Sequence, residues 1–395
     1  MSTDSPSVQD RELRVGMVGY AFMGAAHSTA WRTVNSAFDL SARARMALIC
    51  GRDESKVAGA AAKLGWDAHT TDWREVVERD DIDIVDVCTP GDSHAEIAIA
   101  ALAAGKHVLC EKPLAPTVSD AQAMVEAAAA HPDQVDAVGF TFRRSPAINA
   151  LKEQVEQQLG RVRHFIGDYW CDYGFDPNRP MSWRYQGGPG SGVLADIGSH
   201  MVDLAEFFCG DTVAVQGTTM ATLITERPRP LGVAMGHAGG VQVSDERVPV
   251  ENEDVCTFTT SYANGAVGTI ALSRVAYGHA NSLRFHLFCE GGTASFDLTR
   301  PAEFSIIDGA PAEPVNGART VFIGPWHPYL ARGLPMDFPT VGHGQNDFFV
   351  YQAKAFLDQI ASVQEIPPCP DMAHGLHNLK VLEAVAAATD KPVTV

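Results

Sequence analysis

The chain has 395 residues and carries 30 Lys plus Arg against 48 Asp plus Glu, which gives a net charge of −18. So acidic a chain is a poor partner for nucleic acid or an anionic membrane surface. Its length predicts two domains. The eight cysteines form no CxxC pair, which leaves a zinc ribbon unsupported and favours a reduced, cytoplasmic protein. The polar start of the chain and the lack of a long apolar run indicate neither a secretory signal nor a membrane span.

A glycine turn follows the first predicted strand. Leu13 to Val18 form a short apolar run, and residues 25–34 continue as a helix. Between them, Gly19, Ala21 and Gly24 stand at the spacing of a dinucleotide-binding fingerprint. Gly19 would make the tight turn and Gly24 the close helix–strand contact, with a pyrophosphate on the helix N-terminus. Ala21 departs by one methyl from the usual middle glycine, which weakens the motif.

Strands and helices then alternate up to residue 140. Strands are predicted at 45–50, 82–88, 107–110 and 135–140, and helices at 56–64, 93–104 and 119–130. This rhythm predicts a parallel, doubly wound sheet, in which ligands bind beyond the carboxyl ends of the strands. Thr89, Pro90 and Lys112 fall at such ends.

The end of the second strand bears on the choice of cofactor. An acid there holds the ribose 2′-OH of NAD, whereas a basic residue accepts the 2′-phosphate of NADP. Here Gly51 takes the place of the acid, and Asp53 stands two residues further on. Arg52 could meet a phosphate or stack on adenine. The pattern leans weakly to NADP and leaves NAD(H) or NADP(H) undecided.

Two stretches carry candidate chemistry. In Glu111-Lys112-Pro113, a lysine at a strand end could supply a positive charge or a proton, and the proline bond could be cis. The alternative is a strand-ending turn with a surface lysine. The second stretch, residues 191–203, is predicted to be helical.

In that helix Asp196, His200 and Asp203 stand at i, i+4 and i+7 and share one face. Histidine is well suited to take a proton near neutral pH, and a carboxylate four residues away can orient it. A solvated helix face with an ordinary Asp–His pair is the alternative. One histidine with two aspartates is a thin ligand set, so no metal site is expected.

Beyond residue 146 the pattern changes to antiparallel strands. Strands are predicted at 161–171, 213–223, 255–262, 266–274, 283–289 and 293–298, and closing helices at 345–360 and 372–388. Asn264-Gly265 and residues 290–292 are hairpin signals. Residues 226–249 and 299–343 are rich in Pro and Gly and are interpreted as loops.

The sequence therefore predicts an α/β Rossmann domain over residues 1–145 and an α+β domain with a large, mostly antiparallel sheet over 146–395. The second domain would bind substrate and mediate oligomerisation. Because the outer face of its sheet needs covering, a homodimer or homotetramer is expected.

The motifs together resemble the Gfo/Idh/MocA family of NAD(P)-dependent oxidoreductases. The resemblance rests on VGYAFMG, on CTPGDSHAEIAIAALAAGKHVLCEKPLA and on SGVLADIGSHMVD. It implies that Lys112, Asp196 and His200 surround the substrate carbinol next to the nicotinamide, and that Asp203 is structural. The expected cofactor-binding residues are Gly19, Ala21, Phe22, Met23, Gly24, Gly51, Arg52, Thr89, Pro90, His94, Glu111 and Lys112.

The expected activity is hydride transfer from a ring hydroxyl of a neutral sugar, anhydrosugar or cyclitol to the nicotinamide. Lys112 and His200 would move the proton, and either could be the formal base. Trp183 and Arg184 are expected to join Lys112, Asp196 and His200 in binding the substrate. Two alternatives from the same family remain: a glycoside hydrolase that retains its cofactor, and a non-catalytic dinucleotide-binding sensor.

Overall fold

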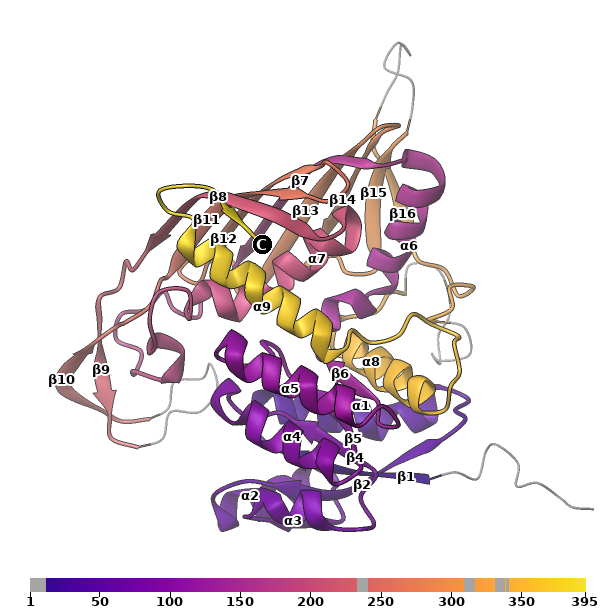
Figure 1. Cartoon of the computed structure of the whole chain (residues 1–395), viewed down its shortest axis with the longest axis vertical. Helices are drawn as coiled ribbons and strands as arrows, with labels where there is room; N and C mark the ends of the chain where they lie inside the picture. The colour runs from indigo at the N-terminus through magenta and orange to yellow at the C-terminus, as the bar shows by residue number, and fades with distance from the viewer. Residues whose placement is uncertain (1–11, 233–240, 309–316, 331–337, 339–340) are drawn as a thin grey trace, which may run out of the picture. The chain divides into compact units, whose positions relative to one another are not determined.

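The structure is a computed structural model that describes residues 12–232, 241–308, 317–330, 338 and 341–395 (Figure 1). The chain divides into two compact units. Unit 1 comprises residues up to Arg144 together with Gly324–Leu379, and unit 2 comprises Ser145–Ile323 together with Lys380–Val395. The first division lies one residue from the predicted one. Residues 324–379 group with unit 1, where the sequence had placed them in the second domain.

Unit 1 contains a parallel sheet flanked by helices (Figure 1). Its strands are β1 (Glu12–Val18), β2 (Arg43–Cys50), β3 (Ala68–Thr70), β4 (Ile84–Val87), β5 (His107–Cys110) and β6 (Asp136–Val138). Its helices are α1 (Phe22–Ala37), α2 (Glu54–Leu64), α3 (Trp73–Glu78), α4 (His94–Ala103), α5 (Val118–Ala130) and α8 (Gln345–Ile360).

Within the described residues this sheet has six strands in the order β3-β2-β1-β4-β5-β6, and every neighbouring pair is parallel. The order reverses between β1 and β4, and dinucleotides bind at such a switch point in doubly wound folds. The predicted Rossmann architecture is confirmed.

Polar side chains cap some of the helices of unit 1. Asp53 precedes α2, and its side chain accepts a hydrogen bond from the amide of Lys56. Thr117 does the same for α5, accepting from the amide of Asp120. Each side chain satisfies an amide of the first helical turn that has no acceptor within the helix. The start of each of these helices is therefore determined by residues close to it in sequence.

Unit 2 is built on a large sheet (Figure 1). Its strands are β7 (Val162–Trp170), β8 (Thr212–Ala221), β11 (Val255–Tyr262), β12 (Val267–Ser273), β13 (Ser282–Cys289), β14 (Thr293–Asp297), β15 (Glu303–Ile307), β16 (Arg319–Phe322) and β17 (Val393–Thr394). Across the described residues its nine strands run β16-β15-β14-β13-β7-β12-β11-β8-β17. Only β7 and β12 pair in parallel, so the expected mostly antiparallel sheet is confirmed.

Helices α6 (Pro146–Gln154), α7 (Ser199–Cys209) and α9 (Met372–Ala387) complete the regular structure. Aromatic rings fill the space between α7 and the sheet. Phe285 of β13 stacks on Phe165 and Phe296 with ring centroids 5.8 and 5.5 Å apart, and Phe208 of α7 lies 5.3 Å from it. This core fixes α7, which the candidate site uses, against the sheet.

Both predicted hairpins are present, whereas two stretches interpreted as loops contain strands. Gly265 turns between β11 and β12 at φ +85°, and residues 290–292 turn between β13 and β14. In the first supposed loop, β9 (Glu226–Pro230) and β10 (Val243–Pro249) form a separate two-stranded ribbon. In the second, β15 and β16 extend the large sheet. Proline is tolerated in edge strands, so a proline-rich composition does not by itself exclude a strand.

None of the helices in the described residues has the length and apolar character needed to cross a membrane.

Candidate active site

The glycine turn of unit 1 has the geometry that the fingerprint predicts. Gly19 follows β1 at φ +106°, and a Cβ there would lie 2.5 Å from the carbonyl oxygen of Cys88. A Cβ on Gly24 would lie 2.1 Å from the carbonyl oxygen of Gly19. Ala21 sits just before α1 at φ −73°, which any residue adopts, so alanine replaces glycine without backbone strain. The N-terminus of α1, with Phe22 and Met23 in its first turn, follows this turn and suits a pyrophosphate.

Tyr20 packs against the end of β2. A Cβ on Gly51 would lie only 1.9 Å from the Tyr20 ring, so position 51 accepts no side chain while that ring stays in place. Arg52 is exposed. The Asp53 carboxylate is used locally, since it caps α2 and forms an ion pair with Lys56 at 3.2 Å. The acid that often follows this strand is therefore replaced by a contact between glycine and tyrosine.

His94 ties together the loops that follow β4 and β5. Its Nε2 lies 2.9 Å from the carbonyl oxygen of Thr89, and its Nδ1 lies 3.2 Å from that of Leu114. The ring is buried, and Pro90 beside Thr89 is exposed. His94 thus shapes the rim where a cofactor is expected. The Lys112–Pro113 bond in the second loop is cis, as the sequence suggested.

Glu111 does not face solvent, although the sequence made it a candidate cofactor ligand. Its side chain is buried, and Oε1 lies 3.0 Å from Nε2 of His27 in α1. Lys112, the next residue, is partly exposed. The two neighbours therefore differ in exposure: Glu111 is buried, and Lys112 is partly exposed.

In unit 2 the predicted helix at 191–203 begins later and less regularly than expected. A π-helical turn spans Leu194–Gly198, and α7 starts at Ser199. Such wide turns often mark functional positions, because they re-aim side chains within a helix. Asp196 lies inside the π-helical turn and His200 in the first turn of α7, and both are partly exposed.

Two side chains hold the Asp196 carboxylate. Tyr173 Oη donates a hydrogen bond of 2.7 Å to Asp196 Oδ2, and Arg184 Nε lies 3.7 Å from the same oxygen. Burial, and then the charge of Asp196, raise the pKa of Tyr173 well above its usual value, so the phenol stays a donor. The structure brings Asp196 and Arg184 together as the sequence expected, and it adds Tyr173, for which no sequence signal was found.

His200 and Asp203 have different surroundings. The His200 ring lies 6.4 Å from the ring of Tyr169, centroid to centroid. Burial raises the pKa of Tyr169 well above its usual value, and its hydroxyl donates to Asn281 Oδ1 at 2.7 Å. Asp203 is buried inside α7, which fits the structural role implied by the resemblance.

Glu253 fixes the start of the π-helical turn. Its carboxylate accepts hydrogen bonds from the amides of Gly190, Gly192 and Leu194 at 2.8 to 3.1 Å. A Cβ on Gly192 would lie 2.4 Å from the Glu253 carbonyl oxygen, so glycine is required there. A buried carboxylate that accepts several amide bonds is strongly held. The sequence analysis missed this anchor, which lies 59 residues after Leu194.

Two arginines contact the Tyr185 ring and hold the backbone beside Arg184. The guanidinium carbons of Arg227 and Arg274 lie 3.9 and 4.7 Å from the ring centroid. Both arginines are fully buried. Arg274 Nη1 donates to the carbonyl oxygen of Arg184 at 2.8 Å, and its Nε donates to Asp254 at 2.7 Å. The arginines thus position the turn that carries Arg184 toward Asp196.

Trp183 is half exposed, and its ring stacks under the Arg184 guanidinium at 4.3 Å. It lines a hollow of about 490 Å³ beside the β9–β10 ribbon, together with residues that include Arg229 and Glu251. Neither Asp196 nor His200 lines this hollow. The sequence analysis expected Trp183 and Arg184 to bind the substrate; in the structure the two side chains stack on each other, and Trp183 is half exposed.

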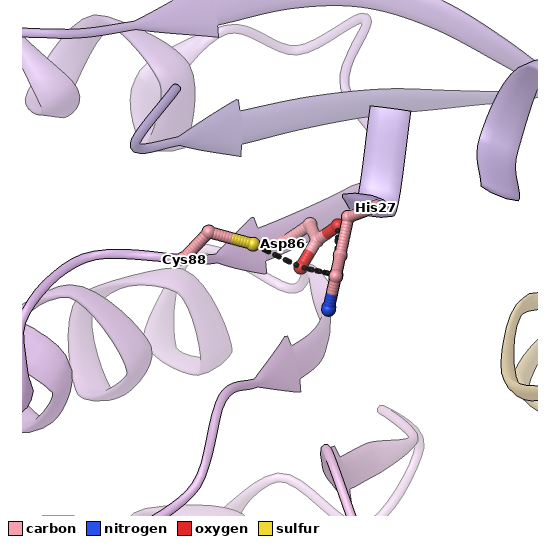
Figure 2. A group of neighbouring side chains, drawn as sticks. All are labelled: His27, Asp86 and Cys88. Carbon is pink, nitrogen blue, oxygen red and sulfur yellow. Dashed lines mark hydrogen bonds and ion pairs between the residues drawn. The ribbon is translucent and has the colours of Figure 1, made fainter. Parts of the chain in front are cut away.

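The described residues contain one group with metal-ligand spacing, shown in Figure 2: His27, Asp86 and Cys88. All three are buried. Both carboxylate oxygens of Asp86 already accept hydrogen bonds, from His27, Trp31 and Cys88. Burial raises the pKa of the Cys88 thiol far above its usual value, which disfavours the thiolate that metals bind. The donor set fits a hydrogen-bonded network and does not fit a metal.

Comparison with known proteins decides the family. Residues 13–139 match the oxidoreductase family described as having an NAD-binding Rossmann fold, and residues 148–295 match the GFO/IDH/MocA C-terminal domain. The chain belongs to the GFO/IDH/MocA family. The family's Rossmann domain gives NAD(H) as the cofactor, where Gly51 and Arg52 had leaned weakly to NADP. The lack of space for a Cβ at Gly19 and Gly24 fits a dinucleotide in this turn.

The named relatives align with most of the chain. A levoglucosan dehydrogenase of Pseudarthrobacter phenanthrenivorans is 36% identical over 363 residues, covering 91% of this chain and 92% of that protein. An inositol 2-dehydrogenase of Saccharopolyspora erythraea is 36% identical over 290 residues, covering 73% and 74%. The solved complex of levoglucosan dehydrogenase with NADH has a TM-score of 0.88 at 33% identity, covering 98% and 99%.

Proposed function

We propose that this GFO/IDH/MocA protein is a dehydrogenase that oxidises a ring hydroxyl of a sugar, anhydrosugar or cyclitol with NAD. The observation that carries the proposal is the Asp196 carboxylate on the π-helical turn, contacted by Tyr173 and Arg184, with His200 following in the first turn of α7. A carboxylate, an imidazole and a guanidinium in one place suit a molecule with several hydroxyls. The similarity to a levoglucosan dehydrogenase over 91% of this chain supports a sugar-like substrate.

The proposed chemistry divides between the cofactor and the side chains. NAD, when bound at the glycine turn, supplies the hydride acceptor. His200 takes the proton of the substrate hydroxyl, and Lys112 holds the same oxygen and stabilises its developing negative charge. Asp196 accepts a hydrogen bond from a neighbouring hydroxyl and keeps the ring in one orientation.

Substrate binding falls to the turn that precedes the π-helical turn. The exposed face of Trp183 offers an apolar surface to the C–H face of a sugar ring. Arg184, 13% exposed at its side chain, presents N–H donors beside Asp196.

The decisive measurement is the NADH absorbance band after the protein is mixed with NAD or NADP and a panel of polyols. The panel contains levoglucosan, myo-inositol and simple aldoses. We expect NADH formation with one class and a clear preference for NAD. Cleavage of a glycoside without net NADH would instead assign the hydrolase chemistry, and tight NADH binding with no turnover of the panel would favour a sensor.

We also propose that the chain forms a homodimer or homotetramer through its large sheet. Val267 of β12, His164 of β7 and Phe288 of β13 stand side by side across the strands. Val267 and Phe288 are 49% and 38% exposed, so this face presents apolar surface that a second copy would cover. Light scattering of the wild type and of Phe288→Lys tests this: a lower mass for the variant is expected, and a monomeric wild type would overturn it.

A cytoplasmic location is the remaining part of the proposal. The cysteines are free thiols, and all but Cys289 are buried, as in a protein of a reducing compartment. Measuring the protein in cell fractions tests this, and recovery from the exported fraction would contradict it.

A further inference from the structure

A buried histidine lies between two carboxylates in unit 1. Nδ1 of His27 lies 3.0 Å from each oxygen of Asp86, and Nε2 lies 3.0 Å from Oε1 of Glu111. The relative exposure of these residues is 2%, 0% and 3%. Figure 2 shows His27 reaching from its helix to Asp86 at the end of its strand. The three residues come from α1, β4 and the loop after β5, so one ring joins three separate segments.

This arrangement keeps a proton in the cluster. Each ring nitrogen faces a carboxylate oxygen, and a neutral imidazole has only one N–H to donate. Burial alone would lower the pKa of His27, but the charge of Asp86 and its hydrogen bond raise it well above the usual value. Trp31 and the Cys88 thiol also donate to Asp86, and the Cys110 thiol and the Phe349 ring lie beside the cluster. The contacts are therefore those of an imidazolium between two acceptors.

The contact to Glu111 bears on the candidate lysine. Glu111 Oε2 accepts a hydrogen bond of 3.2 Å from the amide of Lys112, so the carboxylate links the His27 ring to the lysine backbone. The other side of the carboxylate is closed, because a Cβ on Gly139 would lie 2.7 Å from Oε1. The Glu111 amide also donates to the carbonyl oxygen of Val87 at 3.0 Å. Both carboxylate oxygens of Glu111 are thus engaged within the protein, and they restrain the turn that contains Lys112.

We infer that His27 is a positioning residue, which holds the backbone of Lys112 in place through Glu111. The inference rests on the proposed function, since Lys112 is a catalytic residue only there. Helix α1, which follows the glycine turn, would then have two roles. Its N-terminus would bind the phosphates, and His27 would position the lysine that contacts the substrate hydroxyl.

Two substitutions separate the two contacts of the ring. The amide nitrogen of Asn falls near Nδ1 of histidine, and that of Gln falls near Nε2. His27→Asn therefore keeps a donor for Asp86 and loses the one for Glu111, whereas His27→Gln keeps the donor for Glu111. Both leave a buried acceptor without its charged partner, so both lower the melting temperature. Only His27→Asn releases Glu111.

The two variants should differ in kcat, because only His27→Asn loses the contact with Glu111. Because displacement of a catalytic group by about 1 Å can cost up to about a hundredfold in rate, we expect kcat of His27→Asn to fall at least about tenfold. His27→Gln keeps kcat within about threefold, and KM and NADH affinity stay similar in both. His131→Gln, at the C-terminal end of α5, is the control for loss of an imidazole from unit 1. Equal kcat values for the Asn and Gln variants, or kcat losses that follow melting temperature alone, would overturn the inference.

Hydrogen–deuterium exchange gives a second readout that does not need turnover. Peptides covering residues 107–116 exchange faster in His27→Asn than in His27→Gln or the wild type, while peptides from β13 stay unchanged. If the wild type oxidises no polyol, the proposed function fails, and the exchange pattern still decides whether His27 holds the turn. Unchanged exchange of residues 107–116 in His27→Asn refutes the inference whatever the activity.

A further variant covers the case in which His27→Asn does not fold. Glu111→Gln keeps an acceptor for His27 in its amide oxygen and replaces the acceptor of the Lys112 amide with an NH₂ group. We expect lower kcat and faster exchange of residues 107–116 in this variant. Wild-type values of both would also overturn the inference.

Discussion

Tyr173 and Asp196 form a hydrogen bond of 2.7 Å between the phenol hydroxyl and Oδ2, and the two residues belong to different segments of unit 2. Asp196 sits in a π-helical turn, while Tyr173 follows β7. Burial, then the charge of Asp196, raise the pKa of Tyr173 well above its usual value. The phenol therefore remains a donor over the whole range of pH in which an enzyme works, and the carboxylate keeps one orientation.

Tyr173→Phe tests the value of this bond. Hydrogen bonds to charged groups contribute about 1.5–3 kcal/mol, so we expect kcat/KM for the best polyol to fall at least about tenfold. The melting temperature should fall as well, because the same bond stabilises the folded protein. Tyr277→Phe, which removes a hydroxyl from an exposed ring of the same unit, is the matched control. Equal kcat/KM values for both variants would exclude Tyr173 from the site.

Arg184→Gln tests substrate binding at the same carboxylate. Arg274 holds the backbone of Arg184 through its carbonyl oxygen, so the side chain can be changed while the turn stays in place. Loss of an interaction made equally in the bound and transition states raises KM, and we expect roughly a tenfold increase with kcat changed less. The control is Arg319→Gln, an exposed arginine of the same unit paired with Asp308. A KM equal to that of the wild type would place the sugar elsewhere.

His200→Ala and Lys112→Met test the proton chemistry. Loss of a general acid or base costs about 10²–10⁴ in rate, so turnover should collapse in both variants. The NADH dissociation constant, measured by fluorescence titration, should stay within about threefold for His200→Ala, since the glycine turn is untouched. Normal turnover in either variant would remove that residue from the mechanism.

Much of unit 1 could be predicted because its signals are local. The glycines at 19 and 24 are forced by contacts within a few residues or at the adjacent strand end, and strand–helix alternation gives the sheet. The sequence named the Lys112–Pro113 bond as one that could be cis, and the structure has it cis. Asp196 and His200 were singled out because residues at i and i+4 share one face of a helix, although the structure makes the first turn π-helical.

The support of the site could not be predicted, because it joins residues that are distant in sequence. The His27–Glu111 contact spans 84 residues, and the Arg274–Arg184 contact spans 90. No periodicity or motif relates such positions. The ribbon of β9 and β10 was missed for a related reason. Its strand β9 is anchored by Arg227, whose guanidinium donates to the carbonyl oxygens of Gly174 and Asp176.

Gly51→Ala tests the contact that replaces the usual acid after β2. The added methyl would meet the Tyr20 ring at 1.9 Å, and such overpacking costs about 1–3 kcal/mol. We expect a lower melting temperature and weaker NADH binding, because Tyr20 must leave the end of β2. Gly59→Ala is the matched control, since a Cβ there meets nothing within 4 Å inside helix α2. That change should stabilise the protein by up to about 1 kcal/mol. We expect the melting temperature to fall for Gly51→Ala and to rise for Gly59→Ala. A higher melting temperature for Gly51→Ala would contradict the contact between Gly51 and the Tyr20 ring.

The raised pKa of His27 predicts how stability depends on pH. A histidine whose pKa is higher in the folded than in the unfolded protein stabilises the fold fully below its unfolded value, near 6.5. This contribution is lost as pH rises through the folded value. The titratable groups around the ring are Asp86, Glu111 and the thiols of Cys88 and Cys110, and burial raises the pKa of both thiols well above the usual value.

The measurement compares the melting temperatures of the wild type and His27→Gln between pH 6 and pH 10. Breaking a buried charged network costs about 3–5 kcal/mol, and 1 kcal/mol corresponds to roughly 2–4 °C in a domain of this size, so a gap of about 10 °C is expected at pH 6. The gap should narrow toward pH 10, because the wild type loses the imidazolium that the variant never had. His131→Gln, which changes an imidazole outside the cluster, should follow the wild type throughout. A gap that is constant or widens with pH would mean that the folded wild type holds no more protons in this cluster than the variant does, and would contradict the imidazolium.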